Sequence, residues 1–328
     1  MKHIPFYRYP MIQSLPYMGI FFLALNSNFF CTAQKKPLSK PALNFAHIQL
    51  DELPFPTFRT KRNITTDAAP CISIVIALPK SGSNLLTKCL GLILSRGSDD
   101  IIFRKNLPFP QSLYELSLND LCAMIQESQQ IIWHTHLIYK PEYAVIFKET
   151  QSPIFFGYRD PRDLLVSLAR FMKQCPGIWH GADKIPMDNL IMDLILHNNS
   201  TNNNPPVKGV FNLYQAYLPW RDAPGCYSVR FENLVGAQGG GSQEKQIQEI
   251  KNIAHHVGVI ITDDRAQDIA QNLFGGTWTF DASRDVVKEK AGQIGSWKNY
   301  FTQEHKKAFK TVAGQLLIDL QYEQDFNW

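Results

Sequence analysis

Residues 71–86 read CISIVIALPKSGSNLL. Residues 71–78 are almost continuously apolar and rich in β-branched side chains, which is typical of a strand covered on both faces. Small and polar residues follow and predict a loop that leads into a helix. A strand–loop–helix junction presents free backbone N–H groups and a helix dipole to an anion. The candidate anion-binding residues of this loop are Lys80, Ser81, Gly82, Ser83 and Asn84.

These residue types suit a phosphate. Gly82 lets the backbone approach closely, Lys80 supplies a positive charge, and the polar side chains add short donors. The loop lacks the Gly-Lys-Ser/Thr ending of the common P-loop, because its Lys precedes its Gly. No apolar strand ends in a lone Asp that would help to hold Mg²⁺. We therefore predict phosphate binding without a metal; the alternative is a turn with only a structural role.

Strand and helix patterns alternate from residue 71 to the C-terminus. This alternation predicts an α/β fold with a parallel sheet flanked by helices. The predicted strands are residues 71–78, 129–134, 152–158 and 226–234, and the predicted helices are residues 85–95, 161–173, 243–258 and 305–322.

The composition narrows the class of ligand. The chain has 328 residues and a net charge of +4, which is too mild to indicate nucleic acid but suits a small anionic ligand. The six cysteines include no C-x-x-C pair, so the sequence indicates neither a zinc site nor a dithiol site.

A second candidate anion site lies in FFGYRDPRDLLVS, residues 155–167. Arg159 ends a predicted strand, and Ser167 follows two turns into the next predicted helix. A guanidinium fork and a hydroxyl suit a phosphate, although a salt-bridge cluster at a helix start would look similar. Two phosphate sites at strand ends indicate a nucleotide phosphorylated at two places.

Four motifs in this order carry a family resemblance: PKSGSN before a helix, RDPRDLLVS, VRFENL and GQIGSWKNYFT. From residue 71 to the C-terminus the chain resembles sulfotransferases that use 3′-phosphoadenosine 5′-phosphosulfate (PAPS). The resemblance implies a P-loop-NTPase-like α/β sulfotransferase domain over residues 71–328. It also implies metal-independent transfer of a sulfuryl group to a hydroxyl or amine of a small-molecule or glycan acceptor.

The resemblance assigns roles to residues of each motif. Lys80 to Asn84 would bind the 5′-phosphosulfate end of PAPS, and Arg159 and Ser167 the 3′-phosphate. Phe231 falls where the family often has a Tyr near the adenine. The family's late basic-glycine loop corresponds here to Lys290, Ala291 and Gly292.

The catalytic base is expected in IIWHTHLIY, residues 131–139. The resemblance places His136 on the histidine that takes the proton from the acceptor, a role that suits a group titrating near neutrality. His134 stands where the family has a Lys, so it could share or compete for this role. A polar histidine at a strand end without a chemical role is the alternative.

Two further departures concern the nucleotide site. Leu85 replaces an aromatic residue that often stacks on adenine, and Ala291 replaces a basic residue of the late loop. Both changes predict weaker nucleotide binding than is typical of the family, unless neighbouring cations compensate.

Two other functions fit the same loop. A small-molecule kinase would need a Mg²⁺ ligand set, and a non-catalytic nucleotide-binding protein of the same fold would lack a positioned base. Metal dependence and a transfer assay discriminate among the three.

The N-terminus has the parts of a secretory signal. A basic start precedes a short apolar run, and Ala33 stands at a candidate cleavage point. We expect residues 1–33 to be a signal peptide or short membrane anchor and residues 34–70 to be a linker. A secreted or membrane-anchored protein follows from this interpretation, and a cytoplasmic one follows otherwise.

Overall fold

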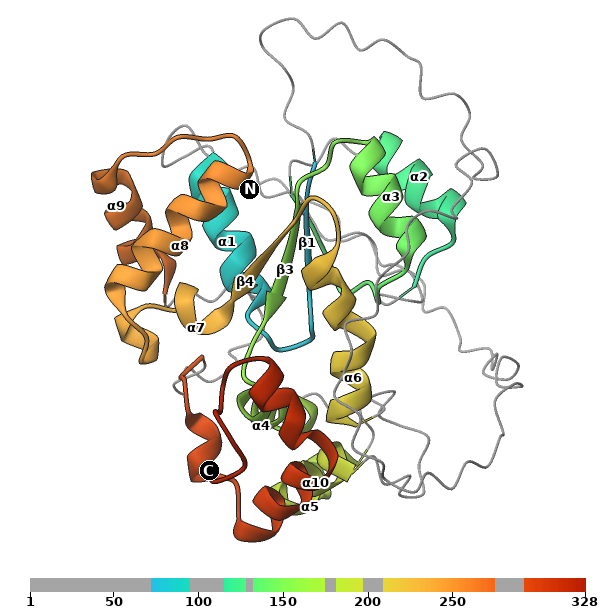
Figure 1. Cartoon of the computed structure of the whole chain (residues 1–328), viewed down its shortest axis with the longest axis vertical. Coiled ribbons are helices and arrows are strands. Elements are labelled where there is room, and N and C mark those ends of the chain that lie inside the picture. Colours follow the sequence, from blue (N-terminus) through green and yellow to red (C-terminus); the bar gives the residue numbers. More distant parts are fainter. Residues whose placement is uncertain (1–71, 95–114, 128–131, 175–180, 197–208, 275–291) are drawn as a thin grey trace, which may run out of the picture. The chain divides into compact units, whose positions relative to one another are not determined.

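The computed structural model describes residues 72–94, 115–127, 132–174, 181–196, 209–274 and 292–328 (Figure 1). Within these ranges, parallel strands form one sheet in the order β2-β1-β3-β4. The strands are β1 (Ser73–Ala77), β2 (Ile132–Thr135), β3 (Ile154–Tyr158) and β4 (Cys226–Arg230). A parallel sheet flanked by helices confirms the predicted fold class.

Helices connect the strands and follow the last one. The α-helices of the described residues are α1 (Ser83–Leu94), α2 (Leu118–Glu127), α3 (Pro141–Glu149), α4 (Pro161–Gln174), α5 (Met187–Leu196), α6 (Val210–Tyr217), α7 (Phe231–Leu234), α8 (Gln243–His256), α9 (Asp263–Leu273) and α10 (Gln303–Asp319). The 3₁₀ helices are η3 (Ala182–Lys184), η4 (Leu218–Asp222), η5 (Ala237–Gly239) and η6 (Ser296–Asn299).

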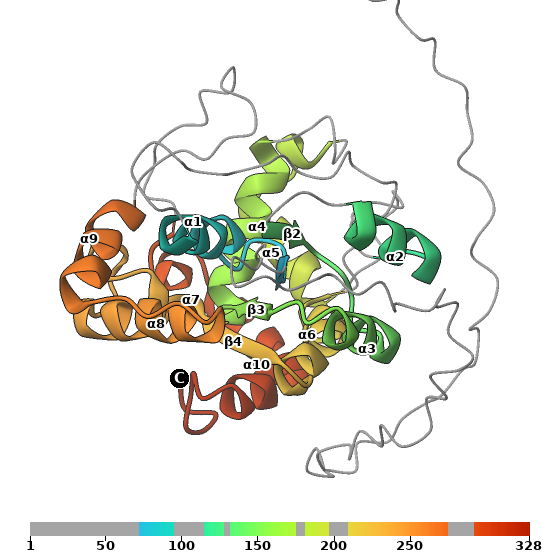
Figure 2. The same ribbon diagram turned by 90° about the horizontal axis from the view of Figure 1, so that it is seen from above.

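One face of the sheet is covered by α1, α8 and α9, which lie together in Figures 1 and 2. Val75 of β1 and Phe155 of β3 pack there with Leu90 of α1, Ile250 of α8 and Ile269 of α9. All of these side chains are buried.

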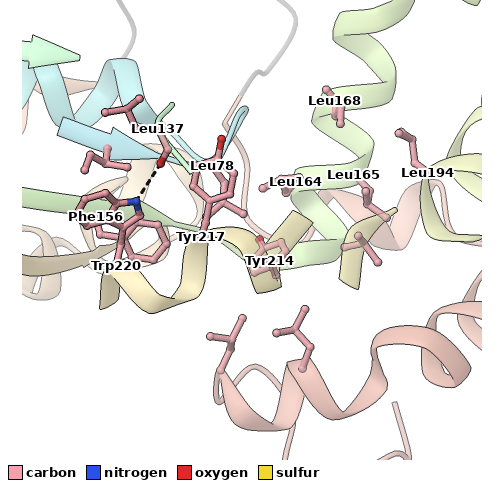
Figure 3. Packing of buried hydrophobic residues seen from close by; sticks show 14 of the residues in the cluster. Leu78, Leu137, Phe156, Leu164, Leu165, Leu168, Leu194, Tyr214, Tyr217 and Trp220 are labelled. Carbon is pink, nitrogen blue, oxygen red and sulfur yellow. Dashed lines mark hydrogen bonds between the residues drawn. The ribbon is translucent and has the colours of Figure 1, made fainter. Parts of the chain in front are cut away.

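The other face carries the larger core. Ile76 of β1 and Phe156 of β3 belong to a cluster with α4, α5, α6 and α10. Trp220 in η4 packs into this cluster, and its indole Nε1 donates a hydrogen bond of 2.9 Å to the carbonyl of Leu137 (Figure 3). Because β1 is buried on both faces, its residues after Ser73 are all apolar.

The chain leaves β1 and β3 toward opposite faces of the sheet. The two strands are hydrogen-bonded neighbours. Helix α1 follows β1 onto the face of Val75, and α4 follows β3 onto the face of Ile76. Ligands of open α/β sheets bind beyond the carboxyl ends of strands at such a point. The loops after β1 and β3 are therefore the place to look for a site.

The structure corrects one element. The sequence predicts a strand over residues 226–234, but β4 ends at Arg230 and the short helix α7 begins at Phe231. The carboxylate of Glu232 in α7 accepts a hydrogen bond of 2.9 Å from the backbone N–H of Asp160. This contact requires the chain to turn back toward the end of β3, which an extended segment would not do.

The predicted N-terminal segments, residues 1–33 and 34–70, lie outside the described residues. Among the described helices, none is both long and apolar enough to cross a membrane.

Candidate functional site

The loop between β1 and α1 is fixed by Ser81. Its Oγ lies 2.7 Å from the carbonyl oxygen of Leu78 and 3.0 Å from that of Gly157 at the end of β3. Carbonyl oxygens only accept, so the hydroxyl donates its proton to this pair. Ser81 therefore shapes the loop against the neighbouring strand, whereas the sequence predicts it as a donor to the anion.

Helix α1 begins directly after this loop. The backbone N–H of Leu86 donates to the carbonyl of Gly82 at 3.1 Å, which starts the helical ladder. The N–H groups of the first turn precede this bond and have no acceptor within a helix. Ser83 is buried and Asn84 is exposed in this turn. The loop after β1 thus presents the positive end of a helix, as an anion site requires.

Lys80 has a left-handed backbone, with φ of 69°. A non-glycine residue in this region costs about 1–3 kcal/mol, so the surrounding structure must hold it there. Its ammonium lies 4.0 Å from the centroid of the Phe171 ring on α4. The loop after β1 is in this way joined to the helix after β3.

Gly82 is required for a reason that the sequence does not reveal. Its φ is +94°, and a Cβ on it would lie 2.4 Å from Cδ2 of Phe231. The glycine therefore allows the loop to pack directly against the first residue of α7. Phe231 itself is 6% exposed.

Arg159 also contacts this ring, with its guanidinium carbon 4.3 Å from the Phe231 centroid. The side chain is buried, and Nη2 donates a hydrogen bond of 2.8 Å to the carbonyl of Gln293. Its Nε is buried without a hydrogen-bond partner among the described residues. A buried donor of a charged group is costly to leave unpaired, so this N–H indicates an acceptor that a ligand supplies.

The late loop reaches the same ring. Gly292 has φ of +88°, and a Cβ on it would lie 3.7 Å from Cζ of Phe231. Lys290 and Ala291 lie outside the described residues. The described part of this loop therefore meets Arg159 through Gln293 and Phe231 through Gly292.

Asp163, the fourth residue after Arg159, anchors the chain that follows the late loop. Its carboxylate accepts hydrogen bonds from the N–H of Gly295 at 2.7 Å, the hydroxyl of Ser296 at 2.9 Å and the N–H of Trp297 at 2.9 Å. Burial raises the pKa of Asp163, while the Arg159 guanidinium and these N–H groups oppose the shift. The second aspartate of the Arg-Asp-Pro-Arg-Asp segment thus fixes the late loop beside Arg159.

Ser167 lies one turn further along α4 than Asp163. Residues four apart share a helix face, so Ser167 lies on the same face of α4 as Asp163. Its side chain is half-buried. This position is compatible with its predicted role at the 3′-phosphate, which stays a prediction.

His136 lies just beyond the end of β2. Its Nδ1 is 2.6 Å from the carbonyl oxygen of Ala77, the last residue of β1. Because a carbonyl only accepts, Nδ1 carries the proton, and Nε2 is the unprotonated nitrogen of the neutral ring. Tyr217 of α6 donates its hydroxyl to the carbonyl of His136 at 2.6 Å and fixes the backbone there.

Burial lowers the pKa of His136. The bond to Ala77 opposes this shift, and the positive charge of Lys80 adds to it. The neutral ring, with its proton on Nδ1, is therefore favoured beside the loop after β1. This is the form that accepts a proton.

His134 lies beside His136, with ring centroids 5.1 Å apart and an interplanar angle of 78°. Its Nε2 is buried without a hydrogen-bond partner among the described residues. Burial, with a contribution from His136, lowers the pKa of His134 to about 3. The ring is therefore neutral at physiological pH and does not replace the positive charge of a Lys.

The structure thus brings most predicted residues to the carboxyl ends of β1, β2 and β3. Contacts or electrostatic interactions connect Lys80, Gly82, His136, Arg159, Phe231 and Gly292. Sequence reasoning missed Asp163, considered Phe171 only as an aromatic residue of a candidate acceptor pocket, and treated Gln293 only as part of a motif. The spacing of Asp163 and Phe171 from Ser167, four residues on either side, was the signal that could have found them.

Comparisons with known proteins agree with this architecture. A family model described as a sulfotransferase domain matches residues 72–321. No curated protein matches the chain.

Solved structures match over most of the chain. Mouse sulfotransferase SULT7A1 complexed with PAP is 16% identical, with a TM-score of 0.53 over 75% of this chain and 84% of that one. Retinol dehydratase in complex with androsterone and inactive cofactor PAP is 14% identical, with a TM-score of 0.49 over 76% of this chain and 81% of that one. The mouse structure shows that the fold is shared.

Proposed function

The chain belongs to the sulfotransferase family, and on this basis we propose that it transfers the sulfuryl group of PAPS to a hydroxyl or amine of a small-molecule or glycan acceptor. The observation that carries the proposal is the hydrogen bond between His136 and Ala77. It holds a proton-accepting Nε2 beside the cationic loop that follows β1. A site that only bound a nucleotide would not need a base in this place.

In the proposed reaction, His136 is the general base and Lys80 stabilises the leaving group. Nε2 of His136 takes the proton of the acceptor hydroxyl as the acceptor oxygen bonds to sulfur. The bond between sulfur and the 5′-phosphate oxygen breaks, and its electron pair stays on that oxygen. The Lys80 ammonium and the N–H groups at the start of α1 stabilise the charge that develops there.

The buried guanidinium of Arg159 supports a second phosphate. Its unpartnered Nε–H fits an oxygen acceptor, and the ring of Phe231 holds the guanidinium plane without neutralising it. We propose that Arg159 and Ser167 bind the 3′-phosphate and that Phe231 borders the adenine. Ser83 and Asn84 lie in the first turn of α1, where the 5′-phosphosulfate would be bound.

A transfer assay tests this function. The full chain is incubated with PAPS carrying labelled sulfate and with a mixed set of phenols, alcohols, amines and oligosaccharides. We expect labelled acceptor and PAP in equal amounts, and equal rates with and without EDTA. The matched control is His255→Ala on the exposed side of α8, which leaves the site unchanged.

The outcomes separate the alternatives. Tight binding of PAP without label transfer to any acceptor would favour the non-catalytic nucleotide-binding protein. Transfer of phosphate from ATP that stops when EDTA is added would favour the kinase.

A further inference from the structure

The contact between Lys80 and Phe171 joins two segments of the site that are far apart in the sequence. The ammonium lies 4.0 Å from the ring centroid, well within the range of a cation–π interaction. Phe171 is half-buried in the last turns of α4. Lys80 also has a left-handed backbone, which is rare for a residue with a side chain, so its side-chain direction is set by an unusual conformation.

Helix α4 presents one face to both ends of the proposed nucleotide site. Asp163, Ser167 and Phe171 are spaced by four residues and therefore share that face. Asp163 binds the late loop, and Phe171 contacts the loop after β1. A rigid helix thus fixes the position of one loop relative to the other.

We propose that Phe171 is a positioning residue for Lys80. Its ring holds the ammonium where the reaction needs a cation, and this role rests on the proposed function. An aromatic ring has no net charge, so it attracts the ammonium without cancelling its charge. A carboxylate in the same place would form an ion pair and weaken the attraction of Lys80 for the leaving oxygen.

The proposal is tested with Phe171→Leu, which keeps an apolar side chain and removes the ring. Phe171→Tyr keeps the ring and serves as the conservative variant. Met172→Leu is the matched control, because Met172 is the neighbouring buried residue of α4 and faces the core. Thermal unfolding of all three variants checks that they are folded.

Two measurements are made. The first is the rate at which a water-soluble acylating reagent modifies Lys80 in the nucleotide-free protein, followed by mass spectrometry of the peptide. The second is steady-state kinetics of sulfuryl transfer, which separates kcat from KM for PAPS and for the acceptor.

We expect Phe171→Leu to increase the acylation rate of Lys80 and to lower kcat by about 3- to 30-fold, the range of a partly desolvated cation–π contact. Phe171→Tyr and Met172→Leu should match the wild-type protein in both measurements. An unchanged acylation rate in Phe171→Leu would overturn the proposal.

A change confined to KM for the acceptor would also overturn it, because Phe171 would then line the acceptor site only. The acylation arm needs no PAPS. A wild-type protein that transferred no sulfate would therefore refute the proposed function. The acylation rates would still test whether Phe171 holds the Lys80 ammonium.

Discussion

The guanidinium carbon of Arg159 lies 4.3 Å from the centroid of Phe231, and the same ring occupies the space that a Cβ on Gly82 would need. One aromatic ring therefore connects the loop after β1 with the arginine after β3. The late loop reaches this ring through Gly292. The two proposed phosphate sites are thus held at a fixed separation by a side chain that carries no charge.

Replacing this ring should loosen both sites. A cation–π contact is worth about 0.5–2 kcal/mol, so Phe231→Leu should weaken PAP binding by roughly 2- to 30-fold. Phe231→Tyr keeps the ring and should bind PAP like the wild-type protein. Isothermal titration of both variants checks this. Equal affinities of the Leu and Tyr variants for PAP would show that the ring of Phe231 does not contribute to nucleotide binding.

Arg159→Ala should act selectively on nucleotides that carry a 3′-phosphate. A charge-assisted hydrogen bond contributes about 1.5–3 kcal/mol, which predicts roughly 10- to 100-fold weaker binding of PAP. The affinity for AMP, which lacks that phosphate, should change little in this variant. Arg159→Lys keeps the charge but not the planar fork and should give an intermediate affinity. If AMP and PAP bind the wild-type protein equally, Arg159 does not read the 3′-phosphate.

The strands that the sequence predicts best are those buried on both faces. Ile74, Ile76 and Phe156 stand in continuous apolar runs because helices cover both sides of β1 and β3, and such runs need no tertiary information to recognise. The start of α7 at Phe231 was not predictable in the same way. Its apolar residue continues the strand pattern, and only the long-range bond between Glu232 and Asp160 reveals the turn.

The site could be predicted as a set of residues but not as a set of contacts. Lys80, Arg159 and His136 stand one or two residues after predicted strands, and parallel strands bring such positions to one edge. The order β2-β1-β3-β4, which places His136 next to Ala77, depends on crossovers that local patterns do not encode. The internal use of the Ser81 hydroxyl likewise depends on Gly157, a residue of another strand.

Lys80→Met should have two effects. Loss of a cation at the leaving oxygen typically costs on the order of 10²–10³ in turnover. The charge of Lys80 also lowers the pKa of His136, so its removal should raise that pKa and shift the rising limb of the pH–rate profile to higher pH. The residual activity of the variant, measured from pH 5 to 9, checks both. Near-normal turnover with an unmoved limb would exclude Lys80 from the mechanism.

His136→Ala should lose about 10²–10⁴ in turnover and retain PAP binding, because it removes the base alone. In the wild-type protein, the rate should rise through a pKa below the ordinary histidine value of 6.5, since burial favours the neutral ring. That limb should vanish in His136→Ala. His134→Gln should lose less turnover and keep the limb. A limb that disappears only in His134→Gln would assign the proton transfer to His134 instead.

His134 should also make the free energy of unfolding depend on pH. Its pKa is about 3 in the folded protein and near 6.5 in an unfolded chain, so the unfolded state binds the proton more tightly. The stabilisation from the neutral ring is complete above pH 6.5 and is lost progressively as the pH falls toward 3. His134→Gln has no titrating ring and should lose about 1–3 kcal/mol less stability than the wild-type protein between pH 7 and 4.

Urea unfolding of the two proteins at a series of pH values measures this difference, with the exposed His255→Gln on α8 as the control. Groups distant from His134 that titrate on acidification contribute equally to both curves, so the difference reports His134 together with its coupling to the neighbouring His136. Parallel curves for the wild-type protein and His134→Gln would show that His134 is protonated as readily in the folded chain as in the unfolded one. The ring could then carry a positive charge in the place of the family's Lys, and the assignment of a neutral His134 would be wrong.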